Sequence, residues 1–448
     1  MGRRSLEMIV NLCKRRGIIF PSAEHYGGLG AVYDFGPLGT FMKEKVKQSW
    51  WRHFVTERKD VFPVDTSILT HSAVLNASGH ISNFVDPLSE CKNCHFRFRT
   101  DHLPSHGKCP HCGISDWTPP VQFNLLFETS LGAAEGSKKQ VYLRPETAQG
   151  IFLALTQVRR AMRASLPFGI SSVGKSFRNE VSPSSFIFRS REFEQMEIEY
   201  FVGAETNVDE CVDSWVQHAL NFFEHTLGIP SKQLRTVEIE SGDRAHYSSR
   251  TVDIEFEWPW GWGELAGVAN RGVFDLQSHR IGPACDDVCA VIEPSLGVER
   301  SLLAALIASL PGGNESDDER ALHLPWNLCA YDVALLPLVR KDAQQNRLLD
   351  DYYRDASRAG FTVATDLTGS IGKRYRRQDE IGTLFAVTID HESVERDGAV
   401  TIRHRDSMAQ VRLDWNRVLA TFRKWQGSNG VECWKELESI GEEVRREG

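Results

Sequence analysis

Apolar and polar residues alternate through residues 175–200, on both sides of a Ser/Pro-rich stretch at 181–185. This is the pattern of two β-strands joined by a polar loop. Because alternate side chains of a strand point to opposite faces, Met196, Ile198 and Tyr200 fall together on one face of the second strand. The pattern therefore predicts a β-hairpin whose apolar face packs inward.

The other face of the predicted hairpin carries charged and polar side chains around one aromatic ring. Its members are Arg178 and Glu180 on the first strand, and Arg191, Phe193, Gln195 and Glu197 on the second. An exposed face laced with ion pairs is the alternative interpretation, but charged residues that converge in one place usually mark a site. We interpret this face as the floor of a site for a ligand that is anionic at one end and cationic at the other.

The first 60 residues have a helical pattern. Residues 38–55 follow a Gly-Pro pair and place apolar residues at helical spacing, and a short strand is predicted at 61–64. Residues 6–60 as a whole are predicted to be helical up to that strand. The helix and the strand together precede everything that carries candidate chemistry.

A different organisation begins after residue 310. A Gly-rich, acidic stretch at 311–320 indicates a linker. Beyond it, strand-like runs alternate with a helix at 342–359, and the strands are predicted at 333–339, 361–364, 386–389 and 399–403. Alternating strands and helices are typical of a small α/β domain.

Four of the ten cysteines form a doubled motif. Cys91-x2-Cys94 is followed after fourteen residues by Cys109-x2-Cys112. Each Cys-x2-Cys turn can supply two thiolates to a tetrahedral ion, so the spacing predicts one closed, structural Zn²⁺ site. The residues between the two turns are too polar to form a core of their own, so the metal would fold this insertion.

Composition narrows the class of protein only a little. The chain has 448 residues, 41% hydrophobic and 25% charged, and a net charge of −8, which argues against a general nucleic-acid coat but permits a local basic face. No run approaches the ~18 apolar residues of a membrane span. The start lacks the apolar region of a secretory signal, so we expect a cytoplasmic protein with no membrane partner.

The hairpin segment, read as Phe-Arg-Asn-Glu, loop, Arg-Glu-Phe, resembles motif 2 of the class II aminoacyl-tRNA synthetases. Its continuation through residue 201 is similar to the dimeric type of glycyl-tRNA synthetase. Three further segments resemble the same family: 141–150 (Arg-Pro-Glu-Thr-Ala-Gln-Gly), 261–276 (Gly-Trp-Gly-Glu-Leu) and 293–300, which is similar to motif 3. The likeness extends from about residue 6 to about residue 413.

The resemblance implies an α+β fold: a class II catalytic domain with an antiparallel sheet flanked by helices, a zinc-ribbon-like insertion and a C-terminal α/β anticodon-binding domain. The domain limits expected from it are 1–322 for the catalytic domain, 88–120 for the zinc insertion, 311–325 for the linker, 326–413 for the anticodon-binding domain and 414–448 for a helical extension. The helix at 38–55 and the strand after it would form motif 1, the dimer element.

The resemblance also implies how ATP and Mg²⁺ bind. Arg178, Glu180 and Arg300 are the expected catalytic residues, with Arg178 at the α-phosphate, Glu180 near the adenine amino group and Arg300 at the γ-phosphate. Arg300 also follows the predicted start of a helix after Gly297, where phosphate groups bind favourably. The full expected ATP-binding set is Arg178, Asn179, Glu180, Phe188, Arg189, Ser190, Arg191, Glu192, Phe193, Glu264, Leu265, Gly297, Val298, Glu299 and Arg300.

Glycine offers only an ammonium and a carboxylate group for recognition. The resemblance implies that Glu146, Glu197 and Glu293 surround the ammonium and that Ser295 lies close to the α-carbon. Charge-assisted hydrogen bonds are about twice as strong as neutral ones, so such a set is chemically reasonable. The full expected glycine set is Arg99, Glu146, Phe193, Glu194, Gln195, Met196, Glu197, Arg271, Glu293, Pro294, Ser295, Leu296 and Gly297.

These features together favour a glycine–tRNA ligase that uses glycine, ATP and tRNA(Gly) and forms a homodimer. A basic cluster in the predicted anticodon domain, Lys373, Arg374, Arg376 and Arg377, is the candidate tRNA contact, and Arg403 with Arg405 is a second. Two alternatives stay open. One is a class II synthetase for another amino acid, and the other is a non-catalytic, nucleic-acid-binding paralogue on the same scaffold.

Overall fold

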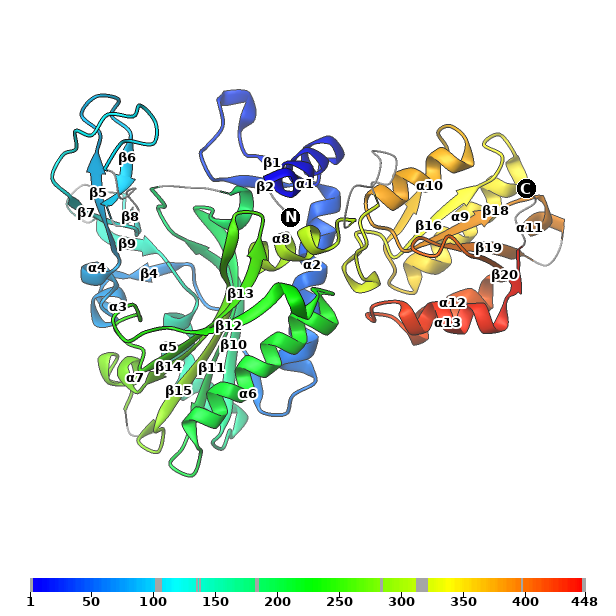
Figure 1. Ribbon diagram of the computed structural model, residues 1–448. Coiled ribbons are helices and arrows are strands. Elements are labelled where there is room, and N and C mark those ends of the chain that lie inside the picture. Colours follow the sequence, from blue (N-terminus) through cyan, green and yellow to red (C-terminus); the bar gives the residue numbers. More distant parts are fainter. Residues whose placement is uncertain are drawn as a thin grey trace.

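The computed structural model describes residues 3–100, 107–133, 136, 138–181, 185–282, 285–311, 321–395 and 398–444. The described chain forms a larger N-terminal part and a smaller C-terminal part that lie side by side (Figure 1). The middle of the predicted hairpin loop (182–184), most of the predicted linker (312–320), part of the predicted insertion (101–106) and the last four residues lie outside the described residues.

A seven-stranded sheet forms the centre of the larger part, in the order β12-β13-β14-β15-β11-β10-β3. Every neighbouring pair is antiparallel except β10 and β3, which are parallel. The predicted antiparallel sheet of an α+β catalytic domain is thereby confirmed. The strands are β3 (Val61–Pro63), β10 (Phe168–Phe177), β11 (Glu192–Val202), β12 (Leu234–Glu238), β13 (Arg250–Trp258), β14 (Gly261–Gly272) and β15 (Ala290–Gly297).

The predicted hairpin is formed by β10 and β11. They pair over their whole length up to Phe177 opposite Glu192, and the Arg178 amide donates to the Arg191 carbonyl oxygen at 2.9 Å just beyond. Met196 and Ile198 are fully buried in the main core, which confirms the apolar face. Arg178 lies past the end of β10, so it is held at the mouth of the hairpin rather than on its floor.

Helices cover this sheet and complete the core. The pair α2 and α8 packs together, and α6 lies along β14 and β15. The helices are α1 (Arg3–Arg16), α2 (Pro37–Trp51, continued by a π-helical turn, Arg52–Thr56), α3 (Ser72–Ala77), α4 (His80–Asn83), α5 (Ala148–Met162), α6 (Val208–Asn221, continued by a π-helical turn, Phe222–Thr226), α7 (Phe274–Ser278) and α8 (Val298–Ala308).

The prediction of continuous helix over residues 6–60 is wrong in its middle. Strands β1 (Ile19–Pro21) and β2 (Tyr33–Phe35) pair antiparallel between α1 and α2. Gly17, Gly27 and Gly28 adopt positive φ angles of 60°, 91° and 75°, a conformation that a helix does not contain and that glycine adopts without steric cost. The apolar spacing correctly predicted helix α2. In the segment before it, the glycines at positive φ interrupt the helix.

Two small sheets lie beside the main one. The first has the order β4-β9-β8, with β4 (Leu69–His71), β9 (Lys139–Leu143) and β8 (Phe127–Leu131). The second has the order β6-β5-β7, with β6 (Arg97–Arg99), β5 (Val85–Glu90) and β7 (Val121–Asn124). This second sheet carries the cysteine-rich insertion, which projects from the catalytic part at the upper left of Figure 1.

The C-terminal part is an α/β domain, as predicted. Its sheet has the order β17-β16-β18-β19-β20-β21, and α10 lies on one side of it while α12 and α13 lie on the other (Figure 1). The strands are β16 (Val333–Pro337), β17 (Val363–Thr365), β18 (Phe385–Ile389), β19 (Ala399–His404), β20 (Gln410–Asp414) and β21 (Glu442–Glu443). The helices are α9 (Ala343–Arg358), α10 (Ile371–Glu380), α11 (His391–Glu395), α12 (Trp415–Lys424) and α13 (Val431–Ile440).

The segment after residue 413 is helical, and its apolar side chains belong to the core. Phe422 and Leu437 are fully buried, and β21 adds a strand to the sheet edge. Ion pairs connect the two parts of the molecule, because Arg15 and Arg16 of α1 both contact Glu380 of α10. Across the described residues, no helix combines the length and apolar character that crossing a membrane would require.

Candidate active site

A pocket lies on the open face of the central sheet, at the end of the β10–β11 hairpin. It contains about 670 Å³ of empty space, part of it open to solvent. The lining residues come from the hairpin, from β14 and β15, and from the start of α8. They are Arg178, Glu180, Ile187, Phe188, Arg189, Ser190, Phe193, Gln195, Glu264, Leu265, Ser295, Gly297, Glu299 and Arg300.

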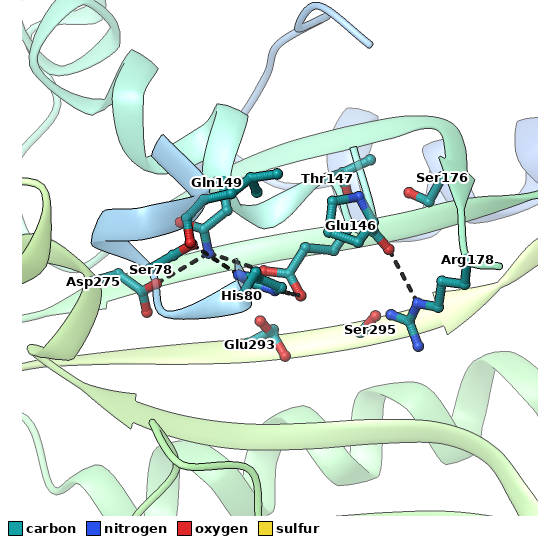
Figure 2. A network of polar contacts seen from close by, with 12 residues as sticks. Ser78, His80, Glu146, Thr147, Gln149, Ser176, Arg178, Asp275, Glu293 and Ser295 are labelled. Atoms are coloured by element: carbon teal, nitrogen blue, oxygen red, sulfur yellow. Dashed lines mark hydrogen bonds and ion pairs between the residues drawn. The ribbon is translucent and has the colours of Figure 1, made fainter. Parts of the chain in front are cut away.

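The Arg178 side chain is held at one end of this pocket by one backbone carbonyl oxygen and by two aromatic rings. Its Nε donates to the Pro145 carbonyl oxygen at 3.1 Å (Figure 2). Its guanidinium carbon lies 5.3 Å from the ring centres of both Phe193 and Phe84. Such a fixed guanidinium fork suits bidentate binding of phosphate oxygens.

Arg300 supplies a second positive charge at the first turn of α8, which begins at Val298 as predicted. Its Nε donates to the Phe188 carbonyl oxygen at 3.2 Å, and its Nη1 lies 3.0 Å from a carboxylate oxygen of Glu264. The charge of Arg300 lowers the pKa of Glu264, and this half-exposed carboxylate is therefore ionised. Two arginines and the N-terminus of a helix thus converge on one pocket.

A buried acidic cluster lies next to the pocket. Glu146, Glu197 and Glu293 are 8%, 2% and 7% exposed, and Arg271, only 1% exposed, lies among them. The Arg271 Nη1 donates to a carboxyl oxygen of Glu293, and its Nε donates to Asp275 at 2.7 Å. The cluster therefore holds more carboxylates than arginines, an imbalance suited to binding a small cation.

Polar side chains join the acidic cluster to its surroundings. Gln149 donates to Glu146 at 2.9 Å and to Asp275 at 3.1 Å, and the His80 ring lies 3.3 Å from Glu146. Figure 2 shows Asp275 and Gln149 at one end of this network and Arg178 and Ser295 at the other.

Gln195 connects the cluster to the pocket. Its Nε2 lies 3.3 Å from Glu197 and 3.5 Å from the Ser295 hydroxyl oxygen. Both Gln195 and Ser295 also line the pocket. A ligand in the cluster and a ligand in the pocket would therefore meet at Ser295.

Burial and charge divide the carboxyl groups into two sets. Burial raises the pKa of Glu146, but His80 and then Arg271 outweigh it, so this pKa lies well below its usual range. Burial and the Glu146 charge raise the pKa of Glu197. Burial raises the pKa of Glu293 to about 8, because Glu197 and Glu146 offset the lowering effect of Arg271. Because the pKa values of Glu197 and Glu293 are both raised, this site can release protons when a cation binds.

Several residues of the expected sets lie away from the pocket and the cluster. Glu194 and Glu299 both form ion pairs with Lys43 of α2, although Glu299 also lines the pocket. Arg191 donates to the Gly30 carbonyl oxygen at 2.6 Å, Glu192 pairs with Lys175, and Arg99 pairs with Asp86 at 3.1 Å. The backbone amide of Asn179 donates to the Leu125 carbonyl oxygen. The other residues of the expected sets that do not line the pocket are buried in the core: Met196, Pro294, Leu296 and Val298.

Some residues of the site carried no sequence assignment. Thr147 donates to Glu197, and Ser176 donates to Gln195 at 2.6 Å. Thr147 and Gln149 lie inside the 141–150 segment that resembles the family, so they could have been predicted from it. Asp275 lies four residues after Arg271 and could have been found in the same way. No local signal pointed to His80, which comes from a short helix before the insertion.

The four cysteines of the insertion meet as predicted. Their sulfur atoms all lie within 4.8 Å of one another. Cys91 and Cys112 are 3.6 Å apart, and Cys94 and Cys109 are 3.7 Å apart. Four sulfurs at ~2.3 Å from a tetrahedral zinc ion would be about 3.8 Å apart, so the cluster could hold one metal ion.

The basic cluster of the C-terminal domain is only partly available to a partner. Arg374 is 2% exposed and donates to the carbonyl oxygens of Gly369 and Pro337. Arg377 pairs with Asp366, whereas Lys373 and Arg376 are exposed. The second candidate pair is buried, at 7% exposure for Arg403, bonded to Asp379, and 3% for Arg405, bonded to Gly382.

Two family descriptions match the chain. Residues 127–310 match the "tRNA synthetase class II core domain (G, H, P, S and T)", and residues 332–425 match the "Anticodon binding domain". The first contains the pocket and the acidic cluster, and the second contains α10 with the basic cluster.

Relatives and solved structures agree with these matches. The chain is 42% identical over 457 residues to glycine–tRNA ligase of Thermobifida fusca (92% of this chain, 96% of the relative). It is 41% identical over 444 residues to that of Borrelia hermsii (93% and 97%). A crystal structure of prolyl-tRNA synthetase from Cryptosporidium parvum with L-proline and AMP has the same fold, with a TM-score of 0.61 at 14% identity (96% of this chain, 79% of that one). The chain belongs to the glycine–tRNA ligase family of the class II tRNA synthetases.

Proposed function

We propose that this protein is a glycine–tRNA ligase that joins glycine to tRNA(Gly) at the expense of ATP. The observation that carries the proposal is the buried cluster of Glu146, Glu197 and Glu293, linked through Gln195 and Ser295 to a pocket with two arginines. A small zwitterion would bind with its ammonium in the cluster and its carboxylate toward Ser295. ATP would bind in the pocket.

In the first step, the glycine carboxylate attacks the α-phosphorus of ATP, and pyrophosphate leaves. Both reactants already carry suitable charges, so positioning and charge neutralisation supply the rate enhancement. Arg178 would bind the α-phosphate and Arg300 the γ-phosphate, while Glu264 keeps Arg300 aligned. Phe193 would stack on adenine and Glu180 would accept from its amino group. Mg²⁺ would accompany the nucleotide and offset phosphate charge.

In the second step, a ribose hydroxyl at the 3′ end of tRNA attacks the glycyl carbonyl carbon, and AMP leaves. The exposed Lys373 and Arg376 of α10 are the proposed phosphate contacts in the anticodon domain, and the buried Arg374 would hold that helix in place.

The proposal includes three further properties. The four cysteines bind one structural Zn²⁺, supported by their sulfur spacing. The protein forms a homodimer, supported by the position of β3 at the edge of the main sheet beside α2. It acts in the cytoplasm, where ATP and tRNA are available.

ATP–pyrophosphate exchange tested with each of the twenty amino acids decides the proposal. Glycine-dependent exchange is expected, and exchange with a different amino acid would mean a class II synthetase of other specificity. No exchange with any of them would favour the non-catalytic alternative. Arg178→Ala should lower the glycine-dependent rate about a hundredfold or more, as loss of one preorganised donor does, while Arg160→Ala, an exposed arginine of α5, should not.

A further inference from the structure

The turn between β13 and β14 stacks two tryptophan rings on each other. The turn itself consists of Pro259 and Trp260, because Trp258 pairs with Gly261 across it. Gly261 has a φ angle of 120°, which glycine adopts without steric cost. The indole rings of Trp258 and Trp260 lie with their centres 5.3 Å apart and their planes 7° apart. The turn therefore presents the two rings as one flat stack.

The stack is anchored at Trp258 and open to solvent at Trp260. Trp258 is 2% exposed, and its indole N–H donates to the Gly263 carbonyl oxygen at 3.1 Å. A Cβ atom on Gly263 would lie only 3.2 Å from the Trp258 ring, so the close approach of strand and ring needs glycine there. Trp260 is 40% exposed. Removing the Trp260 ring would therefore leave the buried half of the stack in place.

Both indole rings meet the Phe188 ring nearly at right angles. The ring centres are 4.9 Å apart for Trp258 and 5.1 Å apart for Trp260. Edge-to-face contacts of this kind are favourable between aromatic rings. Phe188 closely follows Phe186, whose φ of 60° lies in the left-handed region that bulky residues rarely adopt. Such a backbone persists only where its surroundings hold it, and the two tryptophans supply part of that hold.

The Phe188 ring in turn lies against the Arg300 guanidinium. The guanidinium carbon is 4.7 Å from the ring centre, and the Arg300 Nε donates to the Phe188 carbonyl oxygen at 3.2 Å. The ion-pair partner of Arg300 is the half-exposed Glu264, and an ion pair open to water contributes little. Phe188 is therefore the firmer support of Arg300, and its ring and its carbonyl oxygen act together.

We infer that Trp260 is a positioning residue of the active site, which together with Trp258 holds the Phe188 ring and through that ring keeps Arg300 directed into the pocket. The inference rests on the proposed function, in which Arg300 binds the γ-phosphate of ATP. An arginine side chain has many rotamers, and a charge that must first be oriented stabilises a transition state less than a preorganised one does. Trp260 acts only through Phe188 and contacts no substrate.

The test compares the binding of Mg–ATP and of AMP to the wild-type protein and to Trp260→Ala by titration calorimetry. AMP lacks the γ-phosphate, so the substitution should weaken the binding of ATP alone. The Kd of ATP should rise about tenfold, the scale of a small misplacement of a binding group, while the Kd of AMP changes less than about twofold. In glycine-dependent pyrophosphate exchange, the KM for ATP should rise by a larger factor than kcat falls.

Arg300→Ala provides the background that separates a positioning role from a structural one. If Trp260 acts through Arg300, Trp260→Ala should have no further effect on ATP binding in that background, because the effects of coupled residues are not additive. Trp260→Phe keeps an aromatic ring and should restore most of the ATP affinity. Trp262→Ala is the matched control, since it removes a ring of similar exposure, 37%, from the same hairpin, and that ring lies against Arg235 at 4.5 Å. It should leave the ratio of ATP affinity to AMP affinity unchanged.

An unchanged ratio of the two affinities in Trp260→Ala would overturn the inference, and so would effects of Trp260→Ala and Arg300→Ala that multiply in the double variant. If Trp260→Ala does not fold, Trp260→Leu, which keeps apolar cover over Trp258, must lower the ratio instead. A wild-type protein that binds ATP more tightly than AMP but shows no glycine-dependent exchange would refute the proposed function and leave the role of Trp260 standing.

Discussion

Burial and neighbouring charges shift the pKa values of Glu146, Glu197, Glu199 and Glu293, which lie around Arg271. Five carboxylates, those of Glu146, Glu197, Glu199, Glu293 and Asp275, lie within a region that water hardly reaches. Ionising all of them next to a single arginine would carry a large desolvation penalty. The protein avoids that penalty by keeping some of them protonated until a cation arrives.

Glycine binding should therefore release protons. Burial raises the pKa of Glu293 to about 8, so at pH 7 this group is mainly protonated, and a bound ammonium favours its ionised form. Affinity for glycine should rise as pH rises from 6 toward 8. Titration calorimetry at pH 7 in two buffers of different ionisation enthalpy should show release of a fraction of a proton up to about one. Glu293→Gln should abolish the release, and buffer-independent heats in the wild-type protein would contradict the account.

Glu199 offers a test that does not involve catalysis. Its side chain is fully buried, neither oxygen has a hydrogen-bond partner among the described residues, and burial followed by the Glu293 charge raises its pKa well above the usual range. The unfolded chain loses this proton near pH 4.3 whereas the folded chain keeps it, so its contribution to stability falls as pH rises.

Glu199→Gln removes that dependence on pH. The stability of the variant relative to wild type should increase between pH 5 and pH 8, by up to about 1.4 kcal/mol per pH unit. Urea unfolding at the two pH values measures the difference. The exposed Glu205→Gln should show no such trend. A constant difference between Glu199→Gln and wild type would mean that Glu199 is ionised in the folded protein.

At the scale of elements, we expect the cysteine insertion to depend on four thiolates rather than on a core. Cys109→Ser should lower bound zinc from about one ion per chain to a small fraction, measured by atomic absorption, because a closed site needs all four thiolates. Amides of residues 88–100 and 107–120 should then exchange faster, while those of β10 and β11 should not change. The exposed Cys289→Ser is the matched control. Full zinc content in Cys109→Ser would assign the metal to other ligands.

Elements also explain which parts of the site the sequence could reveal. The hairpin, the start of α8 and the paired Cys-x2-Cys turns are local patterns, so their side chains could be assigned from spacing and alternation. His80 lies 3.3 Å from Glu146, and the Tyr247 ring centre lies 3.7 Å from the Arg271 guanidinium carbon. Both residues come from segments distant in sequence, and no local pattern encodes that meeting. The burial of Arg374, Arg403 and Arg405 could not be predicted from the sequence either. A run of arginines has the same pattern whether the side chains are solvated or donate to carbonyl oxygens.

At the scale of the whole molecule, we expect tRNA to contact both parts of the chain. Lys373→Ala/Arg376→Ala should weaken tRNA(Gly) binding and lower the slope of log affinity against log salt by about 2, one for each lost phosphate contact. Glycine-dependent pyrophosphate exchange should not change, since the residues proposed for it lie in the other part. Arg417→Ala/Arg423→Ala on α12, across the sheet from α10 (Figure 1), removes the same charge as a control. An unaltered slope in the α10 variant would place the tRNA contact elsewhere.

The ion pairs between α1 and α10 have a consequence for folding during synthesis on the ribosome. Arg16 precedes its partner Glu380 by 364 residues, so at ~5–20 residues per second the first helix waits about 20–70 s for that partner. Its apolar residues Ile9, Leu12 and Cys13 also belong to the core that contains Leu302 of α8, which is made late. Helix α1 is thus secured only after α8 has been made, and in nascent chains halted before residue 298 it should be open to proteases that cannot cut it in the finished protein.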